Sequence, residues 1–296
     1  MILVTGGTGF VGPKIVHAIR AEDRPVRALV RDAHSSSARQ LDAWGCELAE
    51  GDMTDEQSLR RAVSGCDTVV HLVAIPKGSA ELFERLMAQG TRDLVAAAKD
   101  EGVTRFVLMS ALGTGPESKG LTPYFKAKWD QEQTVKASGI DYTIFRPSFV
   151  FGRDGGTLAI LVRQVRWSPV VAIVGTRRFQ PIWVDDVAAY FAKSLSVDDA
   201  LNKTFEIAGP DVVTWDDVYD RIKRCLGKRR PTFHLPMGVA RAGAFFVEKL
   251  PTDFPVSRDA LTMLEFDDNV TDIAPAVEAL GIRPIGVQEQ VRRAAA

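Results

Sequence analysis

The sequence predicts an α/β protein with a doubly wound parallel sheet and a smaller, mixed C-terminal lobe. Up to residue 152, short apolar runs alternate with longer amphipathic runs, which is the pattern of parallel strands joined by crossover helices. The apolar runs hold almost no polar residues, as strands buried on both faces require. A glycine-rich turn follows the first apolar run and opens the first amphipathic one. These observations favour a sheet that is covered by helices on both faces.

The expected elements follow one another along the chain. Strands are expected at residues 2–5, 26–30, 47–50, 68–72, 105–110 and 142–146. Helices are expected between them at residues 11–20, 56–63, 80–101 and 124–138. After residue 152 prolines punctuate shorter segments, and helices are expected at residues 187–195, 215–226, 237–250 and 258–266. We therefore expect a core over residues 1–152, and a region over residues 153–296 that partly completes this core and forms a substrate lobe.

The composition narrows the class of partner. Lys and Arg total 37 against 38 Asp and Glu, so no global field attracts nucleic acid or an anionic membrane. This balance favours a small-molecule substrate, and a protein complex or a homodimer stays open. Three cysteines at wide spacings form neither a disulfide framework nor a zinc motif. With no recognisable leader and no apolar run of about 20 residues, a cytoplasmic protein without a transmembrane segment is expected.

The glycine-rich turn is the most specific motif. Residues 5–12 read TGGTGFVG between the first expected strand and the first expected helix. Gly6 would permit the tight turn, Gly9 would let a pyrophosphate approach the main chain, and Gly12 would allow close packing of helix on strand. An ordinary glycine-rich turn is the alternative, but the position favours NAD(P) binding by a Rossmann-type fold, with the anion at the helix start. The expected cofactor contacts in this turn are Gly6, Gly7, Thr8, Gly9, Phe10, Val11 and Gly12.

The end of the second strand bears on the choice of nucleotide. Arg31 and Asp32 stand about 20 residues after the turn, where an acid would bind the ribose hydroxyls of NAD and a base would pair with the 2′-phosphate of NADP. Because a guanidinium matches a phosphate in a bidentate way, Arg31 favours NADP(H). Asp32 leaves NAD(H) as the alternative, and both residues could instead be solvated charges at a strand end.

Two later strand ends are expected to complete the cofactor site. Asp52 could accept a hydrogen bond from the exocyclic amine of adenine, and Met53 could pack on the ring. Val73 and Ala74 would bring main chain past the ribose and the phosphates. His71, just before them, is expected to be a structural residue rather than a base.

A second group of residues could carry acid–base chemistry. Tyr124 and Lys128 are four residues apart at the start of an expected helix, so their side chains share a face. A free phenol has a pKa of about 10, and a nearby ammonium would favour the phenolate. Ser110, at the end of the fifth expected strand, could donate a hydrogen bond to the same substrate oxygen. We therefore predict Ser110, Tyr124 and Lys128 as catalytic residues, although Tyr-x-x-x-Lys alone is a weak signal.

Other conspicuous residues have plainer interpretations. Asp185 and Asp186 are best explained by the start of a helix, where negative charge meets the helix dipole. The four histidines are scattered without ligand spacing, so no metal is expected. Four aromatic residues could line an apolar substrate cleft or be hydrophobic core, and core is expected for at least two of them. They are Phe149, Phe151, Trp167 and Trp183.

These motifs resemble those of the short-chain dehydrogenase/reductase superfamily, in particular its atypical, extended-like members with TGGTGFVG loops. Within it the chain most resembles the group that is similar to the NADPH-binding accessory subunit of respiratory complex I. The resemblance covers nearly the whole chain and implies a Rossmann-type sheet, a C-terminal lobe over the nicotinamide end, and Arg31 as the phosphate partner. Tyr124, Lys128 and Pro147 are likewise expected to contact the cofactor. The supporting segments are residues 5–12, 29–31, 51–52, 90–91, 110–111, 146–148, 151–152, 179–187 and 205–210.

The resemblance leaves two functions open. The first is an NADP-dependent oxidoreductase or epimerase-type enzyme that acts on a carbonyl or alcohol of a small, partly apolar molecule. The second is a non-catalytic NADP(H)-binding protein with a structural, assembly or redox-sensing role in a larger complex. The set of Ser110, Tyr124 and Lys128 favours the enzyme, to which we give a slight preference. Met87 favours the second, because many active relatives carry Asn at this position, where it helps to sustain a proton relay through the lysine.

Overall fold

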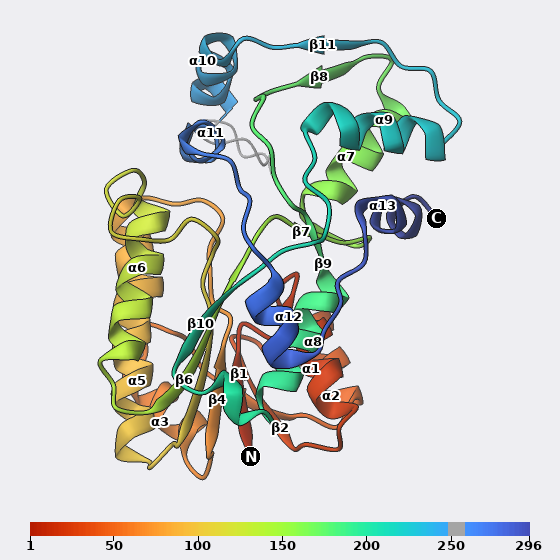
Figure 1. Ribbon diagram of the computed structural model, residues 1–296. Coiled ribbons are helices and arrows are strands. Elements are labelled where there is room, and N and C mark those ends of the chain that lie inside the picture. The colour runs from red at the N-terminus through yellow and green to blue at the C-terminus, as the bar shows by residue number, and fades with distance from the viewer. Residues whose placement is uncertain (248–257) are drawn as a thin grey trace. The chain divides into compact units, whose positions relative to one another are not determined.

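The first half of the chain contributes six strands to one parallel sheet in the computed structural model, which describes residues 1–247 and 258–296 (Figure 1). A seventh strand joins them from the second half, and the order across the sheet is β10-β6-β5-β4-β1-β2-β3. The strands are β1 (Ile2–Thr5), β2 (Val26–Val30), β3 (Glu47–Glu50), β4 (Thr68–His71), β5 (Arg105–Met109), β6 (Asp141–Pro147) and β10 (Lys203–Ile207). Strand order reverses at β1, which lies between β2 and β4, so the turn that leaves β1 stands where open α/β sheets bind ligands.

Helices cover both faces of this sheet, and the predicted doubly wound fold is confirmed (Figure 1). Helices α3, α5 and α6 pack side by side on one face, and α1, α8 and α12 pack together on the other. The helical segments of this part are α1 (Gly12–Arg20), α2 (Ser36–Ala43), α3 (Glu56–Val63), α4 (Ala80–Phe83), η1 (Glu84–Gln89), α5 (Gly90–Asp100), α6 (Pro123–Lys136), α8 (Val184–Ser194), η2 (Asp198–Ala200) and α12 (Ala274–Leu280).

The chain divides into two compact units, each assembled from three segments. Unit 1, which holds the seven-stranded sheet, comprises Met1–Pro147, Val184–Ile207 and Ala274–Arg283. Unit 2 comprises Ser148–Trp183, Ala208–Ile273 and Pro284–Ala296. The C-terminal half thus supplies β10, α8 and α12 to unit 1. The division into a core over residues 1–152 and a substrate lobe over residues 153–296 stays a prediction.

Side-chain caps explain where two helices of unit 1 begin. The Ser35 hydroxyl accepts a hydrogen bond from Ala38 N at the start of α2. The Thr122 hydroxyl accepts one from Phe125 N at the start of α6, where Pro123 occupies the first helical position without the loss of a hydrogen bond. These caps satisfy main-chain N–H groups that the first turn of a helix leaves without a partner.

Several features of unit 1 differ from the expected elements, and helix α12 is one that was not predicted. Helix α2 was not predicted, because it follows a run of serines and buries only Ala38 and Leu41. Strand β10 was not predicted, because it lies beyond the region in which strands and helices alternate regularly. The single helix expected over residues 80–101 is divided into α4, η1 and α5, and η1 is a π-helical turn. Such turns often occur next to functional sites.

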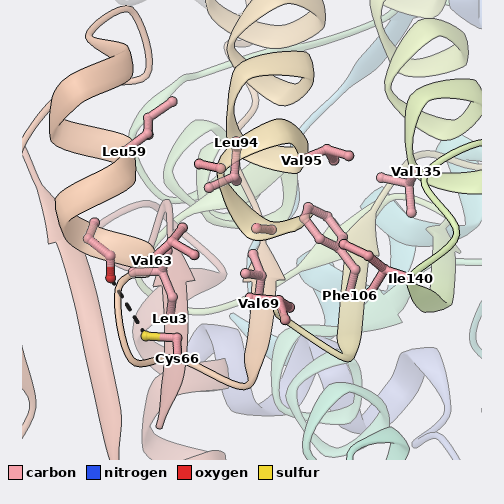
Figure 2. Packing of buried hydrophobic residues seen from close by; sticks show 14 of the residues in the cluster. Leu3, Leu59, Val63, Cys66, Val69, Leu94, Val95, Phe106, Val135 and Ile140 are labelled. Atoms are coloured by element: carbon pink, nitrogen blue, oxygen red, sulfur yellow. Dashed lines mark hydrogen bonds between the residues drawn. The ribbon is translucent and has the colours of Figure 1, made fainter. Parts of the chain in front are cut away.

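One hydrophobic core fills the space between the sheet and helices α3, α5 and α6 (Figure 2). Figure 2 shows side chains from both layers meeting there, and the fully buried members include Leu3, Leu59, Val69, Leu94 and Phe106. Burial of side chains of this size contributes about 1.5–3 kcal/mol each. The core therefore fixes the sheet on which the candidate site depends.

Unit 2 is a mixed assembly of helices with two short pairs of parallel strands. Strand β7 (Val150–Phe151) pairs with β9 (Ile182–Trp183), and β8 (Val171–Ile173) pairs with β11 (Thr232–His234). The helices are α7 (Gly156–Trp167), α9 (Trp215–Cys225), α10 (Met237–Val247), α11 (Arg258–Phe266) and α13 (Val287–Ala295). The helix predicted over residues 237–250 is α10 as far as residue 247, and its last three positions lie outside the described residues.

The four conspicuous aromatic residues of unit 2 divide between core and surface. Phe151 and Trp183 are buried, which confirms the expected core role for two of them. Phe149 is half-buried and meets Trp215 edge to face at 5.5 Å between ring centroids. Trp167, by contrast, is 77% exposed. A single exposed apolar residue is normal on a protein surface, so Trp167 is informative only together with its neighbours.

No helix in the part of the chain that the structure describes is long and apolar enough to cross a membrane.

Replacement of Leu94 by Ala should lower the free energy of unfolding by about 2–5 kcal/mol, because it leaves a cavity in the core of Figure 2. Urea unfolding followed by circular dichroism measures the change. Val212→Ala at a half-exposed position is the control and should stay within about 0.5 kcal/mol of the parent. Equal stability of the Leu94 variant and the parent would show that this core is not packed as described.

Candidate functional site

The chain turns sharply as it leaves β1, and glycines make this turn possible. Gly6 has a φ of +77°, which favours glycine, and its carbonyl oxygen accepts a hydrogen bond from Gly9 N at 3.1 Å. A Cβ on Gly12 would lie 2.3 Å from the Gly6 carbonyl oxygen, so α1 can start here only because position 12 has no side chain. The N–H groups of Phe10 and Val11 meet no hydrogen-bond acceptor among the described residues. They can bind an anion.

A hollow of about 350 Å³ lies beside this turn, at the carboxyl ends of the central strands. The predicted cofactor contacts that line it are Gly6, Thr8, Gly9, Phe10, Val11, Gly12, Arg31, Asp52, Met53, Val73 and Ala74. Residues that were not predicted as contacts also line it, namely Leu29, Gly51, Leu72, Ile75, Leu86 and Met109. A Cβ on Gly9 would approach no protein atom closer than 3.4 Å, so its bare main chain leaves room for a ligand. Free N–H groups, a guanidinium and an apolar wall together fit a pyridine dinucleotide.

The remaining predicted contacts lie outside this hollow. Gly7 packs toward the helical layer, because a Cβ there would meet a Leu41 methyl group at 3.4 Å. Pro147 ends β6, where its carbonyl oxygen accepts a hydrogen bond from Leu112 N at 2.9 Å. Tyr124 and Lys128 do not line the hollow either. Their contact with a cofactor stays a prediction.

The charged residues at the hollow differ in how far they are engaged. Arg31 is exposed, and its guanidinium forms no hydrogen bond or ion pair with the described residues. Asp32 accepts a hydrogen bond from His34 N at 2.8 Å. Asp52 accepts hydrogen bonds from Thr54 N and Thr54 Oγ1, and the hydroxyl bond holds the pKa of Asp52 below its usual value against the opposing effect of burial. Arg31 is therefore the charge that is available to an incoming phosphate.

Ser110 is buried and is held by an acid. Its hydroxyl donates a hydrogen bond to Glu132 Oε1 at 2.6 Å, and Glu132 is itself fully buried. The guanidinium of Arg146 donates to both Glu132 oxygens at 2.8 Å. Burial would raise the pKa of Glu132, but the hydrogen bonds from Arg146 and Ser110 hold it below its usual value. The hydroxyl proton of Ser110 is thus committed to a carboxylate.

Lys128 is buried beside these residues and donates from Nζ to the carbonyl oxygen of Met109 at 2.7 Å. Burial lowers the pKa of Lys128 to about 7, although the negative charge of Glu132 acts in the opposite direction. Lys128 therefore exchanges its proton near neutral pH.

Tyr124 lies in apolar surroundings. Its ring packs against the cluster of Phe83, Met87 and Ala127 and meets Phe83 edge to face at 6.1 Å. Its hydroxyl has no hydrogen-bond partner among the described residues, and burial raises its pKa to about 12. The expected shift toward the phenolate is therefore not found, because Lys128 turns to the main chain. The catalytic roles of Ser110, Tyr124 and Lys128 stay a prediction.

His71 belongs to a buried network that joins β4 to the helices. Its Nδ1 lies 2.6 Å from Thr5 Oγ1, and its Nε2 lies 2.9 Å from Thr91 Oγ1. Thr91 Oγ1 in turn donates to the carbonyl oxygen of Met87 in η1 at 2.6 Å and accepts from Gln131 Nε2 at 2.8 Å. Burial lowers the pKa of His71 to about 3, so the ring stays neutral. This geometry agrees with the structural role that the sequence suggested.

Glu132 and Arg146 are the polar residues that sequence reasoning missed. A signal for Glu132 was present, since it stands one helical turn after Lys128 and two turns after Tyr124 on the same face of α6. No local pattern pointed to Leu86, which reaches the hollow from the π-helical turn η1.

Asp185 and Asp186 lie in the first turn of α8, and Asp185 forms an ion pair with Lys14 at 3.6 Å. Within the described ranges, no group of three or more His, Cys, Asp or Glu side chains could hold a metal ion.

Comparison with known proteins identifies the relatives of this chain. A family model described as NAD(P)H-binding matches residues 6–197, which include the glycine turn and Arg31. NAD(P)H azoreductase of Xenophilus azovorans is 28% identical over 233 residues, which are 77% of this chain and 74% of that protein. The mitochondrial NADH dehydrogenase (ubiquinone) 1 alpha subcomplex subunit 9 of Arabidopsis thaliana is 27% identical over 300 residues, which are 95% of this chain and 73% of that protein.

Among solved structures, an NADPH-dependent quinone oxidoreductase of Escherichia coli complexed with NADPH superimposes with a TM-score of 0.80. The alignment covers 98% of each chain at 22% sequence identity. This likeness shows a shared fold.

The low pKa of Lys128 should make stability depend on pH. In the unfolded chain Lys128 keeps its proton up to a pH of about 10, whereas the folded protein releases it at about 7. Between these values the unfolded state binds more protons, so the contribution of Lys128 to stability rises with pH. The unfolding free energy of the parent should therefore rise relative to that of Lys128→Met between about pH 7 and pH 10. The rise should be at most about 1.4 kcal/mol per pH unit.

Urea unfolding at several pH values measures this difference. Lys99→Met at an exposed position is the control and should show none of this pH dependence. A flat difference for the Lys128 variant would contradict a buried, readily deprotonated Lys128.

Proposed function

Because the chain belongs to the NAD(P)H-binding family, we propose that it is an NADP(H)-dependent reductase of small, partly apolar, electron-poor molecules such as quinones. The observation that carries this proposal is the unengaged guanidinium of Arg31 at a hollow that also receives the unpaired N–H groups of Phe10 and Val11. Bound NADPH would supply a hydride to such an acceptor.

Arg31 supports NADP(H) over NAD(H). The Arg31 guanidinium interacts with the charge of Asp52 but forms no hydrogen bond or ion pair with the described residues, so it can form two parallel hydrogen bonds to a phosphate without breaking a bond within the protein. Asp32 and Asp52 each accept hydrogen bonds from their own loops through Oδ1, Asp32 from His34 N and Asp52 from Thr54. The preference for NADP(H) therefore rests on the guanidinium of Arg31.

The polar residues next to the sheet favour substrates that can accept a hydride without a proton donor held beside the reacting oxygen. Tyr124 is a weak acid because burial in apolar surroundings raises its pKa to about 12, and the proton of Ser110 is committed to Glu132. Reduction of a simple ketone gives a strongly basic alkoxide, which needs an acid at the reacting oxygen. A reduced quinone is a far weaker base and can take its proton from water. The names of two similar proteins, an azoreductase and a quinone oxidoreductase, agree with conjugated acceptors of this kind.

A non-catalytic role is the second candidate, and a specific observation favours it. Met87 is fully buried in the apolar cluster with Tyr124, so no polar side chain at position 87 supports a proton relay. The similarity to a subunit of a mitochondrial dehydrogenase complex agrees with such a role. In that case NADP(H) would stabilise unit 1, and a protein partner would replace the substrate.

The proposed setting is the cytoplasm, with a small molecule and no nucleic acid as partner. Cys46 and Cys66 are buried free thiols and Cys225 is an exposed one, which suits a reducing compartment.

Replacement of Arg31 by Ala should weaken NADPH binding by about 10- to 100-fold, since a charge-assisted hydrogen bond contributes about 1.5–3 kcal/mol. Affinity for NADH should stay unchanged, because NADH lacks the 2′-phosphate. Isothermal titration calorimetry with both nucleotides measures the two affinities, and Arg61→Ala on the exposed side of α3 is the control. Equal losses for both nucleotides would contradict the assignment of Arg31 to the 2′-phosphate.

Reductase activity should appear as oxidation of NADPH in the presence of a benzoquinone, with little or none on a simple aliphatic ketone. Tyr124→Phe should change the quinone rate by less than about threefold, because a relay through Tyr124 would contribute about 100-fold or more. Loss of the quinone rate in this variant would restore the acid–base role predicted from the sequence. Absence of turnover with tight NADPH binding would instead favour the non-catalytic role.

A further inference from the structure

Unit 2 carries a concentration of positive charge that the balance of the whole chain conceals. Residues 221–230 contain six Lys and Arg side chains and no Asp or Glu. They span the last turn of α9 and the connection toward β11. A hollow of about 870 Å³ is lined there by five cations, together with Asp220. The five cations are Lys223, Arg224, Lys228, Arg229 and Arg230.

These cations differ in how far their charge is compensated. Lys223 forms an ion pair with Asp220 at 2.7 Å. Arg230 is held at the surface by a hydrogen bond from Nε to the carbonyl oxygen of Val165 at 3.3 Å. Lys228 and Arg229 are exposed, and their side chains form no hydrogen bond or ion pair within residues 1–247 and 258–296. Two full positive charges therefore face water without a counter-charge.

Exposed apolar side chains lie beside these cations. Trp167 ends α7 with 77% of its surface exposed, and Val170 follows with 43%. Main-chain contact joins the two regions, since Val171 N donates to the carbonyl oxygen of Pro231 at 2.9 Å. Phe233 on β11 is 46% exposed. Exposed apolar side chains and unpaired cations thus lie on and next to the paired strands β8 and β11, which Figure 1 shows side by side.

We propose that this surface, defined by Trp167, Val170, Lys228, Arg229 and Phe233, docks the protein on an anionic lipid membrane. Tryptophan is favoured at the level of lipid headgroups, where its ring is half in apolar and half in polar surroundings. Basic side chains near the surface are attracted to anionic lipids by about 1 kcal/mol each. The combination is typical of peripheral attachment.

The kind of apolar side chain beside the cations favours an anionic membrane over a nucleic acid. A single-stranded nucleic acid would use the same cations with a series of aromatic stacking platforms. Of the three exposed apolar side chains here, Trp167 and Phe233 are aromatic, whereas Val170 is aliphatic and offers an apolar contact to acyl chains but no stacking face. The surface lies wholly within unit 2, so the inference does not depend on the cofactor hollow of unit 1.

Flotation of the whole chain with lipid vesicles tests the proposal. The protein should float with vesicles that contain phosphatidylglycerol, stay unbound with pure phosphatidylcholine vesicles, and be released by about 0.5 M NaCl. The variant Lys228→Glu/Arg229→Glu should reduce the vesicle partition coefficient by about tenfold or more. The control Lys99→Glu/Lys203→Glu makes the same change in net charge at exposed positions of unit 1 and should bind like the parent.

Fluorescence isolates the contribution of the tryptophan. Brominated phosphatidylglycerol vesicles should quench part of the parent emission, and Trp167→Phe should abolish this quenching. A circular dichroism spectrum and a urea unfolding curve like those of the parent report that the fold of each variant is intact. Lys228→Gln/Arg229→Gln replaces the double reversal if that variant does not fold.

Any of four results would overturn the proposal. These are no binding to anionic vesicles, equal binding to neutral vesicles, an equal loss in the control variant, or binding of RNA without binding of vesicles.

Discussion

The approach of helix α1 to the carbonyl oxygen of Gly6 is the constraint on which unit 1 depends. Because position 12 has no side chain, the first turn of α1 can lie against the turn that leaves β1. This turn places Phe10 and Val11 at the hollow beside the carboxyl ends of the central strands, at the point where the strand order reverses. The same contact sets the packing of α1 on α8. Fold and candidate site therefore share one steric requirement.

The polar interior of unit 1 is organised around Glu132. Two hydrogen bonds from Arg146 compensate its buried charge, and Ser110 completes the set. Lys128 has no such partner at hydrogen-bond distance and is satisfied by a main-chain carbonyl oxygen, so burial lowers its pKa. Side chains that could have moved protons are thus engaged in holding β5, β6 and α6 together. This is why the proposed reaction relies on an acceptor that is protonated by water.

Most of unit 1 could be predicted from the sequence, because strands buried on both faces leave continuous apolar runs and the glycine turn has a fixed spacing. Strand β10 could not be predicted in this way, because the chain between β6 and β10 first passes through unit 2 before β10 pairs with β6 in parallel. The hollow was predictable where residues end strands, as for Arg31 and Asp52, and was missed at Leu86, which depends on a π-helical turn. The pKa of Tyr124 was mispredicted in direction, because spacing on a helix does not reveal which way Lys128 turns.

The nucleotide would bind to main-chain amides of unit 1. The membrane would contact exposed cations and the indole of Trp167 in unit 2. The account rests most directly on the first of these contacts. Calorimetric titration of NADPH into the parent and into Gly9→Ala tests it, since a Cβ at position 9 is tolerated by the protein at 3.4 Å but would occupy the hollow beside the turn. We predict binding by the parent and a large loss of affinity in the folded variant. No detectable affinity of the parent for NADPH or NADH, or equal affinity of both proteins, would contradict the account.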